Sequence, residues 1–345
     1  MLYVTTRGKA EVYTAARTLQ IDRGADEGFF VPFRPPVLTP KDVTALAGNK
    51  PSQNIADYLN LLFGTKLTDW DVELILGRNG FQLKELGHKL VIAELWHNRT
   101  GRAAGAVREL ACHINPDGVV DGNPTEWLCL SIRIALVIGI MTELLRNGTV
   151  TPYDPINVAV CSGDFSQVMS VWYAREMGLP IADIIIGCNE NSGVWDLINR
   201  GEIATYGRAR ATSTPEADFV VPPYLERLVH GACGQEEALK LNWCMTEKES
   251  YIPEEEQFEA LRHKLFAAVI SQVRLEIVIP SVYRSHQYIM DLYTALSYGA
   301  LSDYRAKTGD GSWTLLLSEN SPMANATDVA RIMRISEDEL RRRVR

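Results

Sequence analysis

Polar side chains that could bind an anion are concentrated in two short segments, each placed between an apolar run and a helical pattern. The first segment follows the apolar run 89–96 and contains His97, Asn98, Arg99, Thr100 and Arg102. Free backbone N–H groups at a helix start, together with guanidinium groups, can converge on a carboxylate or phosphate. In the alternative interpretation, Thr100 only caps the helix and the arginines pair with surface carboxylates.

The second segment follows the apolar run 156–161 and contains Ser162, Gly163, Asp164, Phe165 and Ser166. A glycine-containing loop between a strand and a helix has the geometry of a phosphate cradle. The alternative is a tight turn in which Ser162 or Asp164 caps the helix. We expect Asp164 or His97 to act as the acid or base, because carboxylate and imidazole groups are common proton carriers.

A third polar segment, Asn189, Glu190 and Asn191, follows the apolar run that ends at Cys188. These residues are further candidates for substrate binding. The alternative is that the asparagines turn the chain and cap the next helix. The histidines have no metal-ligand spacing, so we expect no metal site.

The elements that must position these segments follow an alternating pattern. Apolar strands at 89–96, 156–161 and 313–319 alternate with helical patterns near 103–112, 126–147 and 166–178, which predicts a parallel or mixed sheet flanked by helices. Further helices are expected at 253–275, at 286–306 and from Asn325. Three helical patterns with start signals lie between 39 and 79. The predicted fold class is therefore α/β, with a helical N-terminal module over 1–88 and an α/β core domain over 89–345.

Composition narrows the functional classes. The net charge is −8 without long blocks of one sign, so nucleic acid is not an expected partner. The apolar run 129–145 is interrupted by Arg133 and is shorter than a membrane span, so we expect a core helix and no membrane. Six scattered cysteines without a C-x-x-C pair are typical of reduced thiols, and the first residues lack the apolar core of a secretion signal. Both features predict a cytoplasmic protein.

Several motifs, in collinear order, resemble those of threonine synthases, a branch of the fold-type II enzymes that use pyridoxal phosphate (PLP). Thr5-Thr6-Arg7-Gly8 resembles the family's Ser-Thr-Arg-Gly start, and 94–110 resembles its Glu-Leu-Phe-His-Gly-Pro-Thr-x-x-Phe-Lys-Asp segment. The start of the long apolar helix, 122–127, is similar to the family's Asn-Ser-x-Asn-Trp. The segment 162–191 is similar to its Thr-Gly-Asn-Phe-Gly loop, following helix and Thr-Asn-Glu-Asn strand end. The resemblance implies the same scaffold.

The chain departs from that family at the positions where the family binds its cofactor and substrate. Alignment of His97 and Thr100 with the family's His and Thr puts Ala104 where the family has the Schiff-base lysine, and a methyl group cannot form an imine. Asp164 replaces an Asn and Ser166 a Gly, and a carboxylate would repel a phosphate dianion. About a dozen residues stand where the family has a small α/β domain. We therefore expect a threonine synthase-like scaffold with the small domain deleted and with no cofactor; in an alternative, Lys84 or Lys89 holds PLP.

The resemblance and the departures together predict an enzyme that has lost PLP chemistry. It would act on an amino-acid-like or phosphorylated amino-acid substrate by elimination or intramolecular substitution, a lyase type of reaction in specialised amino-acid biosynthesis. Such reactions need no electron sink at Cα, and orientation of the reacting groups can supply much of the rate. We also expect a homodimer. The alternative function is a non-catalytic binding or regulatory subunit.

Overall fold

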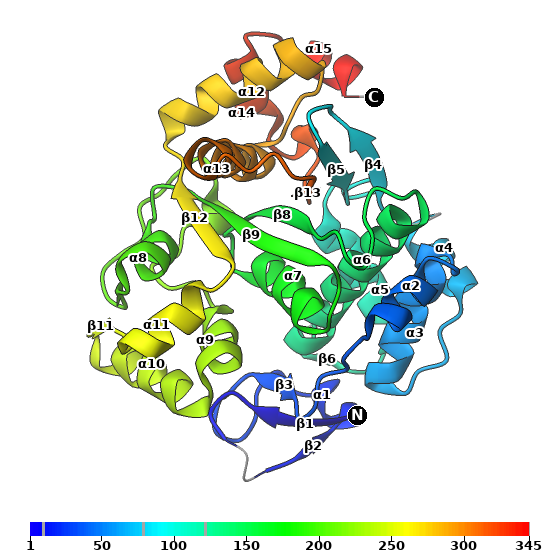
Figure 1. Ribbon diagram of the computed structural model, residues 1–345, viewed down its shortest axis with the longest axis vertical. Coiled ribbons are helices and arrows are strands. Elements are labelled where there is room, and N and C mark those ends of the chain that lie inside the picture. Colours follow the sequence, from blue (N-terminus) through cyan, green and yellow to red (C-terminus); the bar gives the residue numbers. More distant parts are fainter. Residues whose placement is uncertain (9–10, 78–79, 121–122, 345) are drawn as a thin grey trace.

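The computed structural model describes residues 1–8, 11–77, 80–120 and 123–344 (Figure 1). Its centre is a six-stranded sheet in the order β12-β9-β8-β13-β5-β4. The strands are β4 (Gln82–Glu85), β5 (Leu90–Glu94), β8 (Ile156–Cys161), β9 (Ile181–Cys188), β12 (Leu265–Val269) and β13 (Thr314–Ser318). The neighbouring pairs are parallel except β4 with β5, which is antiparallel. The predicted α/β class with a mixed sheet is confirmed.

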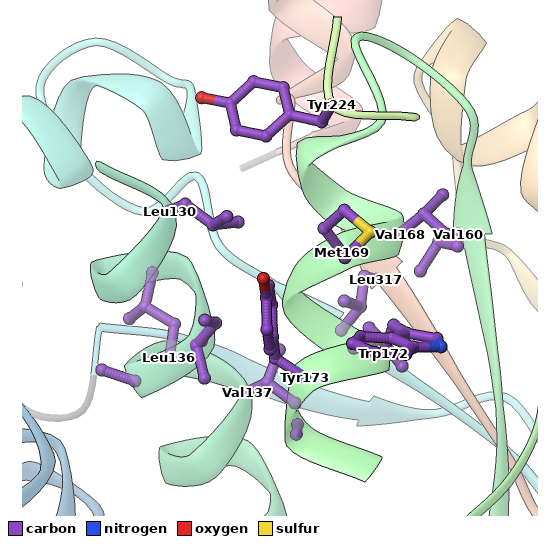
Figure 2. Packing of buried hydrophobic residues seen from close by; sticks show 14 of the residues in the cluster. Leu130, Leu136, Val137, Val160, Val168, Met169, Trp172, Tyr173, Tyr224 and Leu317 are labelled. Carbon is purple, nitrogen blue, oxygen red and sulfur yellow. The ribbon is translucent and has the colours of Figure 1, made fainter. Parts of the chain in front are cut away.

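Helices cover both faces of this sheet, and the strands alternate their side chains between them. Val158 and Val160 of β8 belong to the core beneath α6 (Glu126–Arg146) and α7 (Ser166–Glu176). Ala159 faces the opposite core, under α13 (Leu292–Thr308), α12 (Gln272–His286) and α14 (Ala326–Met333). Figure 2 shows the first core, where Met169 and Tyr173 of α7 lie between α6 and the sheet. The two cores hold the carboxyl ends of the strands in fixed positions.

The long helix α6 is a core helix. Among the described residues it is the single helix long and apolar enough to cross a membrane by length and composition, but 78% of its most apolar window is buried inside the protein. Arg133 lies in the middle of it, and its side chain is 15% exposed. The helix therefore packs under the sheet and carries one cation toward the carboxyl ends of the strands.

The N-terminal residues form a small sheet, one short helix and three longer helices. The sheet consists of β1 (Leu2–Thr5), β2 (Tyr13–Thr14) and β3 (Phe30–Pro32), with the short helix α1 (Ala15–Thr18) after β2. The three helices α2 (Pro40–Leu46), α3 (Pro51–Phe63) and α4 (Asp69–Leu76) are those that the start signals predicted. Capping boxes fix two of the starts, Thr39 with Asp42 and Thr68 with Asp71.

The expected boundary between residues 88 and 89 falls between two paired strands. β4 and β5 are joined in the central sheet, with Lys84 opposite Ile92. The two-domain division stays a prediction. Farther along the chain, α5 (Ala103–Ile114) is connected to α6 by residues 115–125, which include the short strands β6 (Val119–Val120) and β7 (Asn123–Pro124). A connection of this length is too short for a domain.

Two predicted helices were wrong in their extent. The segment 253–275 contains α11 (Glu255–Arg262), strand β12 and the start of α12, because Lys264 turns the chain at φ 59° and the apolar run after it forms the edge strand. The segment 286–306 is also divided: α12 ends at Gln287 in the left-handed region, and α13 begins after its N-cap Asp291. The terminal helical region splits likewise at Arg334 into α14 and α15 (Glu337–Arg343).

The remaining elements follow β9 and build one end of the molecule. They are α8 (Gly193–Arg200), β10 (Ile203–Ala204), η1 (Pro215–Ala217), α9 (Leu225–Cys233), α10 (Gln235–Glu247) and β11 (Ser250–Tyr251), and a second 3-10 turn, η2 (Pro322–Asn325), follows β13. The segment between β10 and α9 is important for the site, because η1 reaches over the carboxyl ends of the central strands. All six cysteines are free thiols, as predicted.

Candidate functional site

A cavity of about 350 Å³ lies at the carboxyl ends of β8 and β13. These two strands are neighbours, and the order of the sheet runs outward from them in both directions. Ligands of open α/β sheets bind at such a switch point. A larger, open groove of about 620 Å³ runs along the edge strand β12, but no predicted site residue lines it. We therefore take the cavity at the switch point as the candidate site.

Five charged residues line this cavity: Arg102, Arg133, Asp164, Glu216 and Glu319. Arg102 and Glu216 form an ion pair at its more exposed side, and Arg133 and Glu319 form a second, more buried pair. Burial disfavours the charged form of Arg133, but the Glu319 and Asp164 carboxylates outweigh burial and raise its pKa. With ionised carboxylates the five side chains carry one excess negative charge, which favours a ligand that has a cationic group.

The loop after β8 places three of its five predicted residues in the cavity wall. Gly163, Asp164 and Ser166 line the cavity, and Gly163 has the left-handed φ of +46° that a glycine accepts easily. Ser162 is buried, and its amide donates to the Gly187 carbonyl at 2.9 Å. The Phe165 side chain is fully buried in the core under α7.

The Asp164 carboxylate binds the amide and the hydroxyl of Ser166, the first residue of α7. Its Oδ1 accepts hydrogen bonds from the Ser166 amide at 2.8 Å and from the Ser166 hydroxyl at 2.5 Å. The Asp164 carbonyl accepts from the Tyr224 amide at 3.2 Å. The Ser166 donors belong to a helix start, which is a place where an external anion can bind. Here the chain supplies a negative charge of its own at that position.

The loop after β5 brings one of its predicted residues to the cavity, Arg102. Asn98 closes the loop: its Oδ1 accepts from the Thr100 amide and hydroxyl at 2.9 and 2.6 Å, and its Nδ2 donates to the Arg102 carbonyl at 2.9 Å. Backbone pairing of Arg102 with Asn320 then fixes the loop against the end of β13. Asn98 and Thr100 therefore shape the loop from outside the cavity wall.

His97 and Arg99 lie on the outer side of the same loop. His97 Nε2 is 2.7 Å from Glu94 Oε2, and its ring stacks on Trp96. The Arg99 side chain is 90% exposed and pairs with Glu109. Neither residue lines the cavity; both line a separate open pocket together with Asn98, Glu109 and His113. The structure therefore does not bring them together with the loop after β8.

The third predicted segment holds η1 in place rather than lining the cavity. Asn189 Nδ2 and Asn191 Nδ2 donate to Asp218 Oδ1 at 2.7 and 2.9 Å. Glu190 pairs with Arg210 at 3.0 Å. Because these contacts anchor both sides of the segment 210–218, they position Glu216 over the cavity.

Sequence reasoning missed seven residues of the cavity wall that carry polar side chains, apart from Cys161: Arg133, Gln167, Glu216, Tyr293, Thr294, Glu319 and Asn320. Arg133 had a visible signal, since a cation in the middle of an apolar helix needs a partner. Glu216 had no such signal in the sequence, because it lies on the short 3-10 turn η1 and not at a junction of strand and helix. Cys161 also lines the cavity, but burial raises the pKa of its thiol, which makes it a poor nucleophile.

No lysine is among the described residues that line the cavity. Ala104 lies in the wall at the start of α5, next to Arg102. Lys84 points elsewhere: its Nζ is 3.1 Å from Glu94 Oε1 and 5.4 Å from the Tyr288 ring centre. Lys89 is exposed at the start of β5, away from the cavity wall.

Known proteins with similar sequences are threonine synthases and their relatives. The chain is 26% identical to human threonine synthase-like 1 over 183 residues, which are 51% of this chain and 24% of that protein. It is 27% identical to threonine synthase of Pseudomonas aeruginosa over 161 residues, 45% of this chain and 33% of the enzyme. The matched segments thus span a quarter to a third of these relatives. No protein-family model matches the chain.

Solved structures extend the similarity over the whole chain. The crystal structure of PLP-bound threonine synthase from Brucella melitensis aligns with a TM-score of 0.85 and 17% identity, covering 96% of this chain and 91% of that one. Yeast threonine synthase aligns with a TM-score of 0.80 and 16% identity, covering 96% and 90%. The chain therefore has the threonine synthase fold and is threonine synthase-like in part of its sequence.

Proposed function

We propose that this chain is an enzyme of the threonine synthase-like scaffold that works without PLP on an amino-acid-like substrate. The reaction would be an elimination or intramolecular substitution of the lyase type. The observation that carries the proposal is the charged cavity itself: two arginines and three carboxylates converge at the switch point of the sheet, and no lysine is among the described residues of its wall. Charged groups placed around a small cavity can orient a zwitterion and stabilise developing charge.

The cavity residues do not fit PLP. An imine requires a lysine amine, and the residue that the sequence resemblance places at that position, Ala104, carries a methyl group. The start of α7 also carries a negative charge already, since the Asp164 carboxylate accepts from both donors of Ser166. A phosphate dianion brought to this position would meet a carboxylate of the same sign. Both facts argue against the cofactor of the B. melitensis neighbour.

The same charges favour one part of the predicted substrate class. An ammonium group is attracted to the excess negative charge of the five side chains, whereas a phosphate dianion at the start of α7 would meet the Asp164 carboxylate. We infer a substrate with an amine and a carboxylate, the carboxylate binding Arg102 in place of Glu216. Arg102 suits this role because its pair is the more exposed of the two.

Asp164 is the proposed acid or base of the reaction. It lines the cavity, and two hydrogen bonds from Ser166 orient its carboxylate. The cavity wall also carries Arg133, whose charge could stabilise a leaving group that becomes negative. His97, the other predicted proton carrier, lies on the outer side of the loop. The cytoplasmic location and the homodimer stay predictions.

One observation favours the alternative, a binding or regulatory subunit. Both cavity arginines are already paired with carboxylates of the same chain, so a ligand must compete with an internal partner. The test is a panel of free and O-substituted amino acids, incubated with the purified protein and followed by mass spectrometry. The proposal predicts product formation that Asp164→Asn reduces by about 100-fold or more. Saturable binding without any product would support the subunit instead.

A further inference from the structure

A second proton-carrying group lies directly behind the cavity wall. Asp291, the N-cap of α13, is 1% exposed, and the cavity-lining residue Thr294 is one turn farther along the helix. The Thr294 hydroxyl donates to Asp291 Oδ2 in a short hydrogen bond. Thr294 therefore connects the buried Asp291 carboxyl to the cavity by a hydrogen bond.

The donors around Asp291 are amides and hydroxyls. Its Oδ1 accepts from the Tyr293 amide at 2.9 Å and from the Thr294 amide at 3.2 Å. Its Oδ2 accepts from Thr294 and, at 3.4 Å, from the Ser318 hydroxyl. Trp96 Nε1 in turn donates to Ser318 Oγ at 3.2 Å, so the Ser318 proton is free to point toward Asp291 or Thr294. Each polar group of this buried cluster has a partner.

This arrangement differs from an ordinary ion pair, because the contacts named above bring no cation to the carboxylate. Burial raises the pKa of Asp291 to about 6, against hydrogen bonds from Thr294 and Tyr293 that lower it. The other titratable groups beside it are Cys161, Tyr288 and Tyr293, and burial keeps all three protonated by raising their pKa. Glu94 lies beyond Tyr288, and Glu319 follows β13 in the cavity wall.

The protonation state of Asp291 decides what Thr294 offers to the cavity. When Asp291 is ionised, the Thr294 proton is held by Oδ2, and the hydroxyl oxygen can only accept a hydrogen bond, either from the Ser318 hydroxyl, whose Oγ is 3.0 Å away, or from a ligand. When Asp291 is protonated, it donates to Thr294, whose own proton becomes available to a ligand or to Ser318. An ionised Asp291 thus prepares Thr294 for an ammonium or hydroxyl group.

We propose that Thr294 and Asp291 form a proton-accepting pair at the closed side of the cavity, in which Thr294 contacts the ligand and Asp291 is a positioning residue that acts through it. This inference rests on the proposed function of the same cavity and extends it. In the step, a ligand N–H or O–H bond breaks as its proton passes to Thr294 Oγ1, and the Thr294 proton passes to Asp291 Oδ2. The charge of the ligand falls by one, so that an ammonium becomes a neutral amine or a hydroxyl becomes an alkoxide, and Asp291 becomes neutral.

The test needs no substrate. Carboxyl-labelled aspartate is followed by carbon-13 NMR from acid to neutral pH, with Asp291→Asn to assign the resonance. The proposal predicts a titration midpoint near 6 that rises in Thr294→Val, which lacks the hydroxyl, and stays in Thr294→Ser, which keeps it. A midpoint at the ordinary aspartate value, or the same midpoint in Thr294→Val, would overturn the pairing.

A second measurement uses methylammonium as the probe of the cavity. We expect the folded wild type to bind methylammonium several-fold more tightly above the Asp291 midpoint than below it. The change should be larger than the change in Asp291→Asn. Thr294→Ser should keep the wild-type difference. A purely structural role would leave the pH dependence equal in all variants, and this result, or absence of binding, would overturn the proposal. If methylammonium binding follows the prediction while the amino-acid panel yields no product, the proton-accepting role of Thr294 and Asp291 is supported and the enzymatic proposal fails.

Discussion

Asp164 and Ser166 form a closed hydrogen-bonded pair at the start of α7, with the carboxylate 2.8 Å from the Ser166 amide. In a helix start of this kind the free amides and the helix dipole attract anions. The pair therefore replaces an external anion by a side chain of the same loop. This relationship supports our proposal that the chain works without the PLP that is bound in the B. melitensis threonine synthase.

Arg102 and Arg99 provide a matched test of the anion site. Both lie on the loop after β5 and both pair with a glutamate, but only Arg102 lines the cavity. We expect Arg102→Ala to weaken binding of an amino-acid ligand by about 10-fold or more, since a charge-assisted hydrogen bond is lost. Isothermal titration calorimetry measures the change, and Arg99→Ala is the control that should bind normally. Equal affinities of the two variants would remove Arg102 from the site.

Asp291 should make the stability of the fold depend on pH. Because burial raises the pKa of Asp291 from 3.8 to about 6, the folded state binds this proton more tightly than the unfolded chain. Below the unfolded pKa, Asp291 is protonated in both states and does not change the free energy of unfolding. As pH rises from the unfolded pKa to the folded pKa, the unfolded chain ionises first, so the free energy of unfolding falls; above the folded pKa the loss is constant. We expect Asp291→Asn to gain about 2 kcal/mol relative to the wild type between about pH 4 and about pH 7. Urea unfolding at several pH values measures this difference, and a flat or falling profile would contradict it.

Arg227 of α9 should be essential for the stability of the N-terminal region. Its side chain is fully buried, pairs with Glu126 Oε1 at 2.9 Å and donates to the Phe30 carbonyl. Arg227→Met leaves a partly buried carboxylate and a carbonyl without this donor, so we expect a loss of about 3–5 kcal/mol in the free energy of unfolding. Arg200→Met is the control, because its pair with Asp196 is exposed and worth about 0.5 kcal/mol. Similar losses of stability in both variants would show that the buried Arg227 contacts contribute no more than an exposed ion pair.

The central strands could be predicted from the sequence because apolar runs such as 156–161 are bounded by clear polar loops, and the start signals at Thr39 and Thr68 are capping boxes with a local hydrogen-bond pattern. The strand β12 was hidden, since its five residues follow a charged helical pattern and only the neighbouring β9 shows that they pair. Strand pairing is a long-range contact that a local pattern does not contain.

The cavity was predictable only where the chain turns from strand to helix. Asp164 and Arg102 were identified because each stands at such a junction. Glu216 and Thr294 could not be found in this way, because η1 is an irregular segment and Thr294 lies inside a helix. Their place in the wall depends on contacts such as Asn189 with Asp218, which join segments 29 residues apart.

The most direct test of the central claim is a cofactor-trapping measurement on the purified protein. The protein is incubated with excess PLP, its absorbance spectrum is recorded, and the sample is reduced with borohydride before peptide mass spectrometry. Since the described wall of the cavity has no lysine and the Asp164 carboxylate binds the first amide of α7, we predict no internal aldimine absorbance and no pyridoxyl-lysine in the cavity. A stoichiometric pyridoxyl adduct on a single lysine, formed together with an aldimine band, would contradict the account.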